Sequence, residues 1–254
     1  MEHARQVIDF DRRLSMLVMD GVERIEVAVR MQVGYVLGRS PVFAHEDPGL
    51  HRHVHRTAGR PQTGDAAPSQ HAEWLRRVLE RRDGSDEGFV AHFRDKHDGQ
   101  MPIWALTEVM EMEHLARLYR GLHQQYAEEI ARSFAVPTKT LMVSWLASLN
   151  YMRQVAAHQA RLFNRKLQYA PGRPKKGQLP LLDHLRDEAT AKGVFGTYNT
   201  LAVIAYLLRS IEDDPGWCRW LVDLIEEFPS SHALSPASMG VPEDWAEFEL
   251  WSRS

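Results

Sequence analysis

The residues of this sequence best suited to chemistry are an arginine and a histidine five positions apart, Arg153 and His158. Arginine stays charged and offers a planar set of donors to phosphate oxygens, and histidine exchanges a proton near neutral pH. Cleavage of an RNA phosphodiester needs a base for the 2′-hydroxyl, an acid for the leaving 5′-oxygen and positive charge at the phosphate. The pair therefore suits RNA cleavage.

The spacing alone is weak evidence. In a chain of this composition, an arginine followed after four to six residues by a histidine is expected about four times by chance. Two other pairs fit the pattern, Arg39 with His45 and Arg117 with His123. Arg153 and His158 differ from these pairs because they lie on a predicted helix inside a cationic region.

That region, residues 130–182, contains no aspartate or glutamate. The chain as a whole has 31 lysines and arginines against 34 acidic residues, so the remainder is acidic. A basic face on an otherwise acidic protein attracts phosphates. The alternative is a solvated basic loop at 171–177. The cations of the region are Arg132, Lys139, Arg153, Arg161, Arg165, Lys166, Arg173, Lys175 and Lys176.

Helical geometry relates these side chains to one another. On an ideal helix His158, Arg161 and Arg165 share a sector of about 60°, so one imidazole would be flanked by two guanidinium groups. Arg153 lies about 140° from His158 and must reach around the helix. A symmetric dimer with two copies of this helix across a cationic cleft would supply both an acid and a base. Alternatively, helix termini and nearby carboxylates satisfy both residues.

Other clusters carry less chemistry. Imidazoles bind transition metals, but His-x-His spacing in a loop rich in proline and glycine is also typical of a solvated segment; these histidines are His45, His51, His53 and His55. A carboxylate group on a predicted helix is interpreted as an exposed or interdomain face; it comprises Glu108, Glu111, Glu113 and His114. No phosphate loop, nucleophile elbow, zincin helix or paired CxxC occurs. We therefore expect neither a metal nor a cofactor.

The composition is that of an ordinary globular protein. The 254 residues are 44% hydrophobic and 26% charged, and the single cysteine, Cys218, has no intrachain partner. The most apolar run, residues 201–208, is far shorter than the roughly 20 residues of a membrane helix. The first residues lack the pattern of a signal peptide. We expect a cytoplasmic protein with no membrane partner.

Hydrophobic spacing of three and four residues predicts an all-α fold, without alternating strands. Pro102 is expected in the first turn of its helix. Residues 40–70 have no periodicity and are predicted to form a long loop, and a short piece ends the chain at 245–251. The predicted helices cover 9–37, 71–82, 87–96, 103–122, 124–134, 139–166 with a break near 148–150, 181–192, 197–211 and 217–228.

Several sequence blocks occur together in order: FDRRL at 10–14, ERIEVAVR at 23–30, PIW at 102–104 with Glu108, LARLY at 115–119, WL at 145–146, LN at 149–150 before Arg153 and His158, RLFNR at 161–165, and MGVPE-x-W at 239–245. In these blocks the chain resembles the Abi (abortive infection) family of prokaryotic phage-defence proteins, a branch of the HEPN superfamily. Ordered blocks over most of the chain are more specific than the arginine and histidine alone.

The resemblance implies a HEPN-like helical bundle over residues 1–170 and additional C-terminal helices, 181–254, packed on the same domain. It also implies a metal-independent endoribonuclease that acts on RNA as a homodimer and is held in check by a neutralising RNA or protein. The catalytic pair would be Arg153 and His158. The RNA-binding neighbours would be Asn150, Arg161, Asn164, Arg165 and Lys166.

Two alternatives remain open from the sequence. In one, the same basic face only holds RNA or a protein partner, as a non-catalytic HEPN module. In the other, the chain is a structural helical interaction protein, which does not require basic residues to converge on His158.

Overall fold

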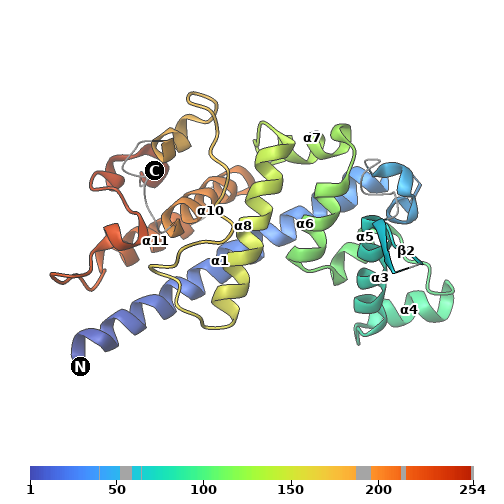
Figure 1. Cartoon of the computed structure of the whole chain (residues 1–254), viewed down its shortest axis with the longest axis horizontal. Coiled ribbons are helices and arrows are strands. Elements are labelled where there is room, and N and C mark those ends of the chain that lie inside the picture. Colours follow the sequence, from blue (N-terminus) through green and yellow to red (C-terminus); the bar gives the residue numbers. More distant parts are fainter. Residues whose placement is uncertain (40, 52–58, 64, 187–195, 213–215, 253–254) are drawn as a thin grey trace. The chain divides into compact units, whose positions relative to one another are not determined.

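The computed structural model describes residues 1–39, 41–51, 59–63, 65–186, 196–212 and 216–252 (Figure 1). These residues form two compact units, Met1–Ile25 with Phe134–Ser254, and Glu26–Ser133. The first helix, α1 (Glu2–Gly38), contributes residues to both units. The all-α prediction is confirmed apart from one short hairpin.

Helix α1 buries a single stripe of apolar side chains, which accounts for its length. Side chains spaced three or four residues apart, from Phe10 and Leu14 through to Val36, are at most 3% exposed. Charged residues on its outer side form ion pairs along the helix, such as Arg24 with Asp20 at 3.1 Å. The predicted helix at 9–37 is therefore confirmed and extends slightly at both ends.

The first unit is built around α10 (Thr197–Ile211), which is buried at every position from Thr197 to Leu208. Helix α10 packs against α8 (Lys139–Ala157) and α11 (Trp217–Glu226). At Gly21 of α1 a side chain would meet Ile204 at 2.7 Å, so only glycine permits this approach. Helix α8 begins at Thr138, whose hydroxyl accepts a hydrogen bond from the Leu141 amide at 3.2 Å.

Short 3-10 helices complete this unit: η4 (Pro180–Arg186), η5 (Pro236–Met239), η6 (Trp245–Glu247) and η7 (Glu249–Trp251). The predictions at 197–211 and 217–228 are confirmed. The predicted helix at 181–192 is instead a 3-10 helix as far as Arg186, and its remaining residues lie outside the described part of the chain.

The second unit combines short helices with a two-stranded antiparallel hairpin. Its elements are η1 (Ala44–Glu46), η2 (Pro48–Leu50), β1 (Gly59–Thr63), β2 (Asp65–Ala67), α3 (Gln70–Asp83), α4 (Gly88–Lys96), α5 (Ile103–Leu106), η3 (Thr107–Val109), α6 (Met112–Gly121) and α7 (Gln124–Ser133). The hairpin and the two 3-10 helices correct the prediction that 40–70 is a loop without regular structure. The helices predicted at 71–82, 87–96 and 124–134 are confirmed.

The helix predicted over 103–122 is wrong as a single element. Helix α5 passes directly into η3 at Thr107, and Met110, whose backbone is extended with ψ at 137°, separates η3 from α6. The Met110 carbonyl accepts a hydrogen bond from the Arg30 guanidinium at 3.0 Å, which replaces a helical bond. Pro102 precedes α5 as its N-cap and does not lie in the first turn.

One buried histidine of this unit makes the stability depend on pH. His45 is 2% exposed, and burial, with nearby His71 and Arg82, lowers the pKa of His45 to about 4. The folded pKa lies below the unfolded value, so the stabilisation is present above pH 6.5 and is lost as the pH falls towards 4.

We expect the free energy of unfolding to be about 2 kcal/mol lower at pH 4.5 than at pH 7 because of this group. Urea denaturation at the two pH values measures the difference. His45→Gln removes the titrating group and should flatten the dependence. An unchanged dependence in that variant would contradict the assignment to His45.

Candidate functional site

The chain reverses direction directly after the candidate histidine. Helix α8 ends at Ala157 with His158 as its C-cap, and Gln159 follows in the left-handed conformation with φ at 51°. The amide of Ala160 donates to the Val155 carbonyl at 3.1 Å, and that of Gln159 donates to the Ala156 carbonyl at 3.0 Å. This is the Schellman arrangement, with glutamine in the position that glycine usually occupies. The predicted continuation of the helix to 166 is wrong, and the break near 148–150 is absent.

An aspartate of α1 holds the segment after the turn. The Asp11 carboxylate accepts hydrogen bonds from the amide of Leu162 at 2.9 Å and from that of Phe163 at 2.7 Å. The ring of Phe163 lies 6.2 Å from that of Phe228, which in turn lies 4.7 Å from the ring of Phe10. A helix could not use these two amides in this way. Asp11 therefore fixes where the chain runs after His158.

The two candidate catalytic residues occupy the last turns of α8. The His158 side chain is exposed and has no ion pair within the described part of the chain. Arg153 is half-buried on the helix. Five residues of helix separate their Cα atoms by about 140° around the axis and about 7.5 Å along it. In one chain the two residues therefore start from different sides of α8.

Arg165 reaches the end of α8 by folding back onto the helix. Its Nε donates to the Tyr151 hydroxyl at 2.9 Å, and its guanidinium lies 5.8 Å from the centre of the Tyr151 ring. A second tyrosine, Tyr169, is 51% exposed and lies edge-to-face against Tyr151 with ring centres 5.8 Å apart. Arg165 therefore contacts α8 at Tyr151, about two turns before His158, and reaches it from the loop that follows the helix.

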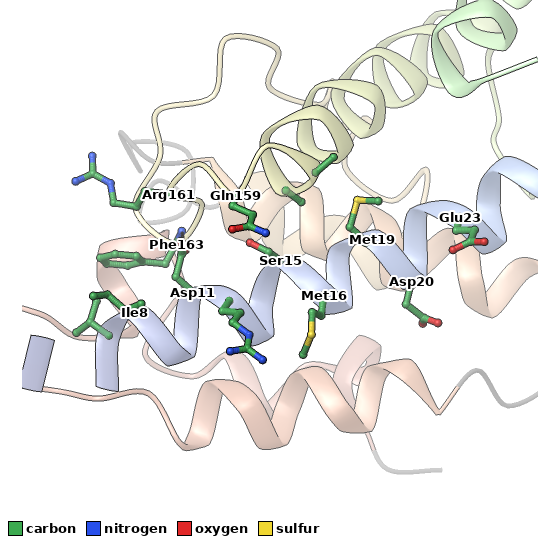
Figure 2. A pocket seen from close by; sticks show the side chains of 14 residues that line it. Ile8, Asp11, Ser15, Met16, Met19, Asp20, Glu23, Gln159, Arg161 and Phe163 are labelled. Atoms are coloured by element: carbon green, nitrogen blue, oxygen red, sulfur yellow. Dashed lines mark hydrogen bonds between the residues drawn. The ribbon is translucent and has the colours of Figure 1, made fainter. Parts of the chain in front are cut away.

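The other predicted RNA-binding residues are spread around the turn. Arg161 is exposed and its side chain extends outward (Figure 2). Lys166 is also exposed, and Asn150 is half-buried on α8. Asn164 is half-buried, and its side-chain oxygen has no hydrogen-bond partner among the described residues. The predicted 60° sector of His158, Arg161 and Arg165 does not form, because the helix ends before Arg161.

A cleft of about 1030 Å³ lies between α1 and the end of α8 (Figure 2). Ala157 and Gln159, which flank His158 in sequence, contribute to its wall, whereas Arg153 and His158 do not. Its charged lining residues are Asp11, Asp20 and Glu23 against Arg12 and Arg161. The cleft of one chain is thus slightly acidic, unlike the cationic groove that the sequence predicts between two subunits.

The basic loop at 171–177 lies elsewhere on α8. The amide of Gly172 donates to the Ser144 hydroxyl at 2.7 Å, and the Trp145 indole donates to the Gly172 carbonyl at 2.8 Å. Ser144 precedes His158 by 14 residues, or about 21 Å of helix. The cations of the acid-free region therefore form separate groups along α8.

The alternative clusters of the second unit have structural roles. His45 and His51 are buried, and the ring of His51 lies 4.4 Å from that of His71. His53 and His55 lie outside the described residues, among which no group of three or more side chains suits a metal ion.

The carboxylates of α6 and of its N-cap form ion pairs with arginines. Glu111 pairs with Arg81 of α3 at 3.3 Å, and Glu113 pairs with Arg117 at 2.9 Å. His114 Nδ1 accepts a hydrogen bond from the Glu111 amide at 3.2 Å. These contacts link α3 to α6 and leave Glu108 exposed on η3.

Sequence reasoning missed two residues of the site. Asp11 appears in the sequence only as one member of the FDRRL block at 10–14. Its place in that block was the only available signal. Tyr151 gave no signal, because its contact with Arg165 depends on the turn at Gln159.

The described residues thus define a mainly helical protein with a histidine at the end of a long helix, followed by a segment that is anchored to α1. A family model described as Abi-like protein matches residues 1–164, which include α1, α8 and both candidate catalytic residues. The chain belongs to the Abi-like protein family. Membership implies a role in abortive infection, a form of phage defence. No curated protein and no solved structure matches the chain. Among the described residues, no helix is long and apolar enough to cross a membrane.

Proposed function

We propose that this protein is a metal-independent endoribonuclease of the HEPN type, with Arg153 and His158 as its catalytic pair. One observation carries the proposal: His158 is the C-cap residue of α8 and exposes its imidazole, in a segment that has no carboxylate from residue 130 to 182. A segment without carboxylates of its own leaves its exposed cations available for phosphates. Cleavage of RNA during infection is consistent with a role in abortive infection.

The reaction assigns one proton transfer to each of two histidines. One His158 removes the proton from the 2′-hydroxyl, and the 2′-oxygen bonds to phosphorus. The bond from phosphorus to the 5′-oxygen breaks as the second His158 protonates that oxygen. The products are a 2′,3′-cyclic phosphate and a 5′-hydroxyl. Arg153 stabilises the negative charge on the phosphate in the transition state.

Two histidines require two chains, because one chain presents a single imidazole at the end of α8. We therefore assign the activity to a homodimer in the cytoplasm. A cellular ribonuclease that acts during infection also needs restraint at other times, which we assign to a neutralising RNA or protein.

The surroundings of His158 suit single-stranded RNA. Arg161 and Lys166 are exposed and can neutralise phosphates, and Asn150 and Asn164 offer amides to the same strand. Tyr169 exposes a ring on which a base can stack.

A non-catalytic RNA- or protein-binding module is the second candidate. It is favoured by the placement of Arg153 and His158 on different sides of α8 in one chain. It is also favoured by the contact of Arg165 with Tyr151, which directs that guanidinium towards the helix. In this reading the basic groups hold a partner and no bond is cleaved.

Incubation of labelled single-stranded RNA with the protein in excess EDTA separates the two candidates. We expect cleavage, together with binding that weakens as salt increases. Replacing Arg161 and Lys166 by alanine should lower the slope of log affinity against log salt by about 1.4, since each phosphate contact contributes about 0.7. Arg94→Ala on α4, another exposed helix position, is the control.

Binding without cleavage would favour the second candidate. An absence of salt-dependent RNA binding would contradict the nuclease and the RNA-binding module, and would leave a protein-binding module or a structural helical protein.

A further inference from the structure

The outward face of α1 exposes several large apolar side chains. Ile8 is 66% exposed, Met16 is 56% exposed and Val27 is 56% exposed. In the described part of the chain, no other element exposes as many large hydrophobic residues. They lie opposite the buried stripe that begins at Phe10. Several exposed large apolar side chains along one side of a helix are typical of a surface that another element covers.

These residues belong to a regular series with two charges: Ile8, Arg12, Met16, Met19, Glu23 and Val27. The series repeats after 11 residues, which is close to three helical turns. All six positions therefore fall within about 100° of the circumference of one unbroken helix. Figure 2 shows the middle of this face, with Met16, Met19 and Glu23.

The series is symmetric about the midpoint between Met16 and Met19. From either end it gives apolar, charged, apolar, apolar, charged and apolar positions. The two charged positions have opposite signs, Arg12 and Glu23. A face with this symmetry is complementary to itself when turned end over end.

We propose that a second copy of this chain docks on this face, with the two α1 helices antiparallel about a two-fold axis. Arg12 then meets Glu23 of the second copy at both ends of the contact. Met16 meets Met19 of the second copy at the centre, and Ile8 meets Val27 of the second copy outside the charges. A parallel arrangement would place Arg12 against Arg12.

The charges of this face favour a second copy over another partner. Arg12 and Glu23 are both exposed, and neither has an ion pair within the described part of its own chain. Their neighbours on α1 do have partners, as Asp20 pairs with Arg24 and Arg13 pairs with Glu227. A second copy explains why the two symmetric positions carry opposite charges, because each charge then meets its opposite. A partner of unrelated sequence does not require this symmetry.

This inference adds a contact surface to the homodimer of the proposed function. It rests on that function in relating the contact to His158. Arg12, Met16, Met19 and Glu23 line the cleft whose opposite wall includes Ala157 and Gln159. A second copy seated there lies beside the turn that carries His158. The docking itself requires no RNA.

Sedimentation at micromolar concentration tests the docking through charge reversal. We expect the wild-type chain to be dimeric. Arg12→Glu and Glu23→Arg should each raise the dimer dissociation constant about 100-fold, because like charges then face each other at both ends of the contact. The double variant should restore the dimer. An equal mixture of the two single variants should form a heterodimer, since opposite charges again meet at both ends.

Arg94→Glu on α4 makes the same change on another exposed helix and should leave the dimer intact. A monomeric wild-type chain, or single variants that remain dimeric, would overturn the proposal. RNA cleavage is measured separately: a monomer that cleaves RNA overturns both the docking and the assignment of the two proton transfers to two chains. A dimer that fails to cleave RNA overturns the nuclease alone.

Discussion

Replacing His158 with alanine is expected to reduce RNA cleavage about 1,000-fold and to leave the fold and RNA binding nearly unchanged. The expected loss is large because the same residue supplies the acid and the base, and general acid–base catalysis contributes about 100-fold to 10,000-fold. The side chain is exposed, and the cap of α8 is made by backbone groups, so the free energy of unfolding should change by less than about 0.5 kcal/mol.

Single-turnover rates in EDTA measure this effect, and thermal unfolding with RNA binding checks the fold. His232→Ala changes another exposed histidine of the same unit and should cleave RNA at the wild-type rate. The wild-type products should end in a 2′,3′-cyclic phosphate. Cleavage by His158→Ala within tenfold of the wild type would remove His158 from the mechanism.

The second large effect is expected at Asp11, a positioning residue that acts through the backbone after His158. Asp11→Ala leaves the amides of Leu162 and Phe163 without their acceptor. Hydrogen bonds to a charged group stabilise a fold by about 1.5 to 3 kcal/mol, so we expect a loss of about 3 kcal/mol for the two amides together. Cleavage should fall about tenfold, because Arg161 and Arg165 are then no longer held near His158.

Hydrogen exchange at the two amides is the readout that a general loss of stability would not reproduce. In Asp11→Ala these amides should exchange faster than those in the middle of α8. Asp11→Asn retains one acceptor oxygen and should recover about half of the lost stability. Asp9→Ala removes an exposed carboxylate two residues away, on another side of α1, and should have little effect. Unchanged protection of Leu162 and Phe163 would contradict the anchoring role.

The helices that the sequence predicts well are those in which the pattern of apolar residues follows directly from the pattern of burial. Helix α1 buries one stripe, and α10 is buried all round between helices, so their limits follow from composition. The region 103–122 was harder, because buried residues continue through Thr107, Val109 and Met110 while the backbone changes from helix to extended. Burial alone does not distinguish these conformations.

At the candidate site, too, residue types could be predicted from the sequence, but the backbone conformation could not. Arg153 and His158 could be chosen from residue type and context. The end of α8 could not be predicted, since Gln159 adopts a left-handed conformation that glycine or asparagine usually signals. The hydrogen bonds from Leu162 and Phe163 to Asp11 join residues about 150 positions apart, a pairing that no local pattern reveals.

The central claim is that each active site uses His158 from both of two chains. The most direct test is the activity of dimers assembled from wild-type and His158→Ala chains in equal amounts, after coexpression. If both histidines are needed at one site, only dimers of two wild-type chains cleave RNA, and the specific activity should be about one quarter of the wild-type value. A value of about one half would show that each chain acts alone and would contradict the account.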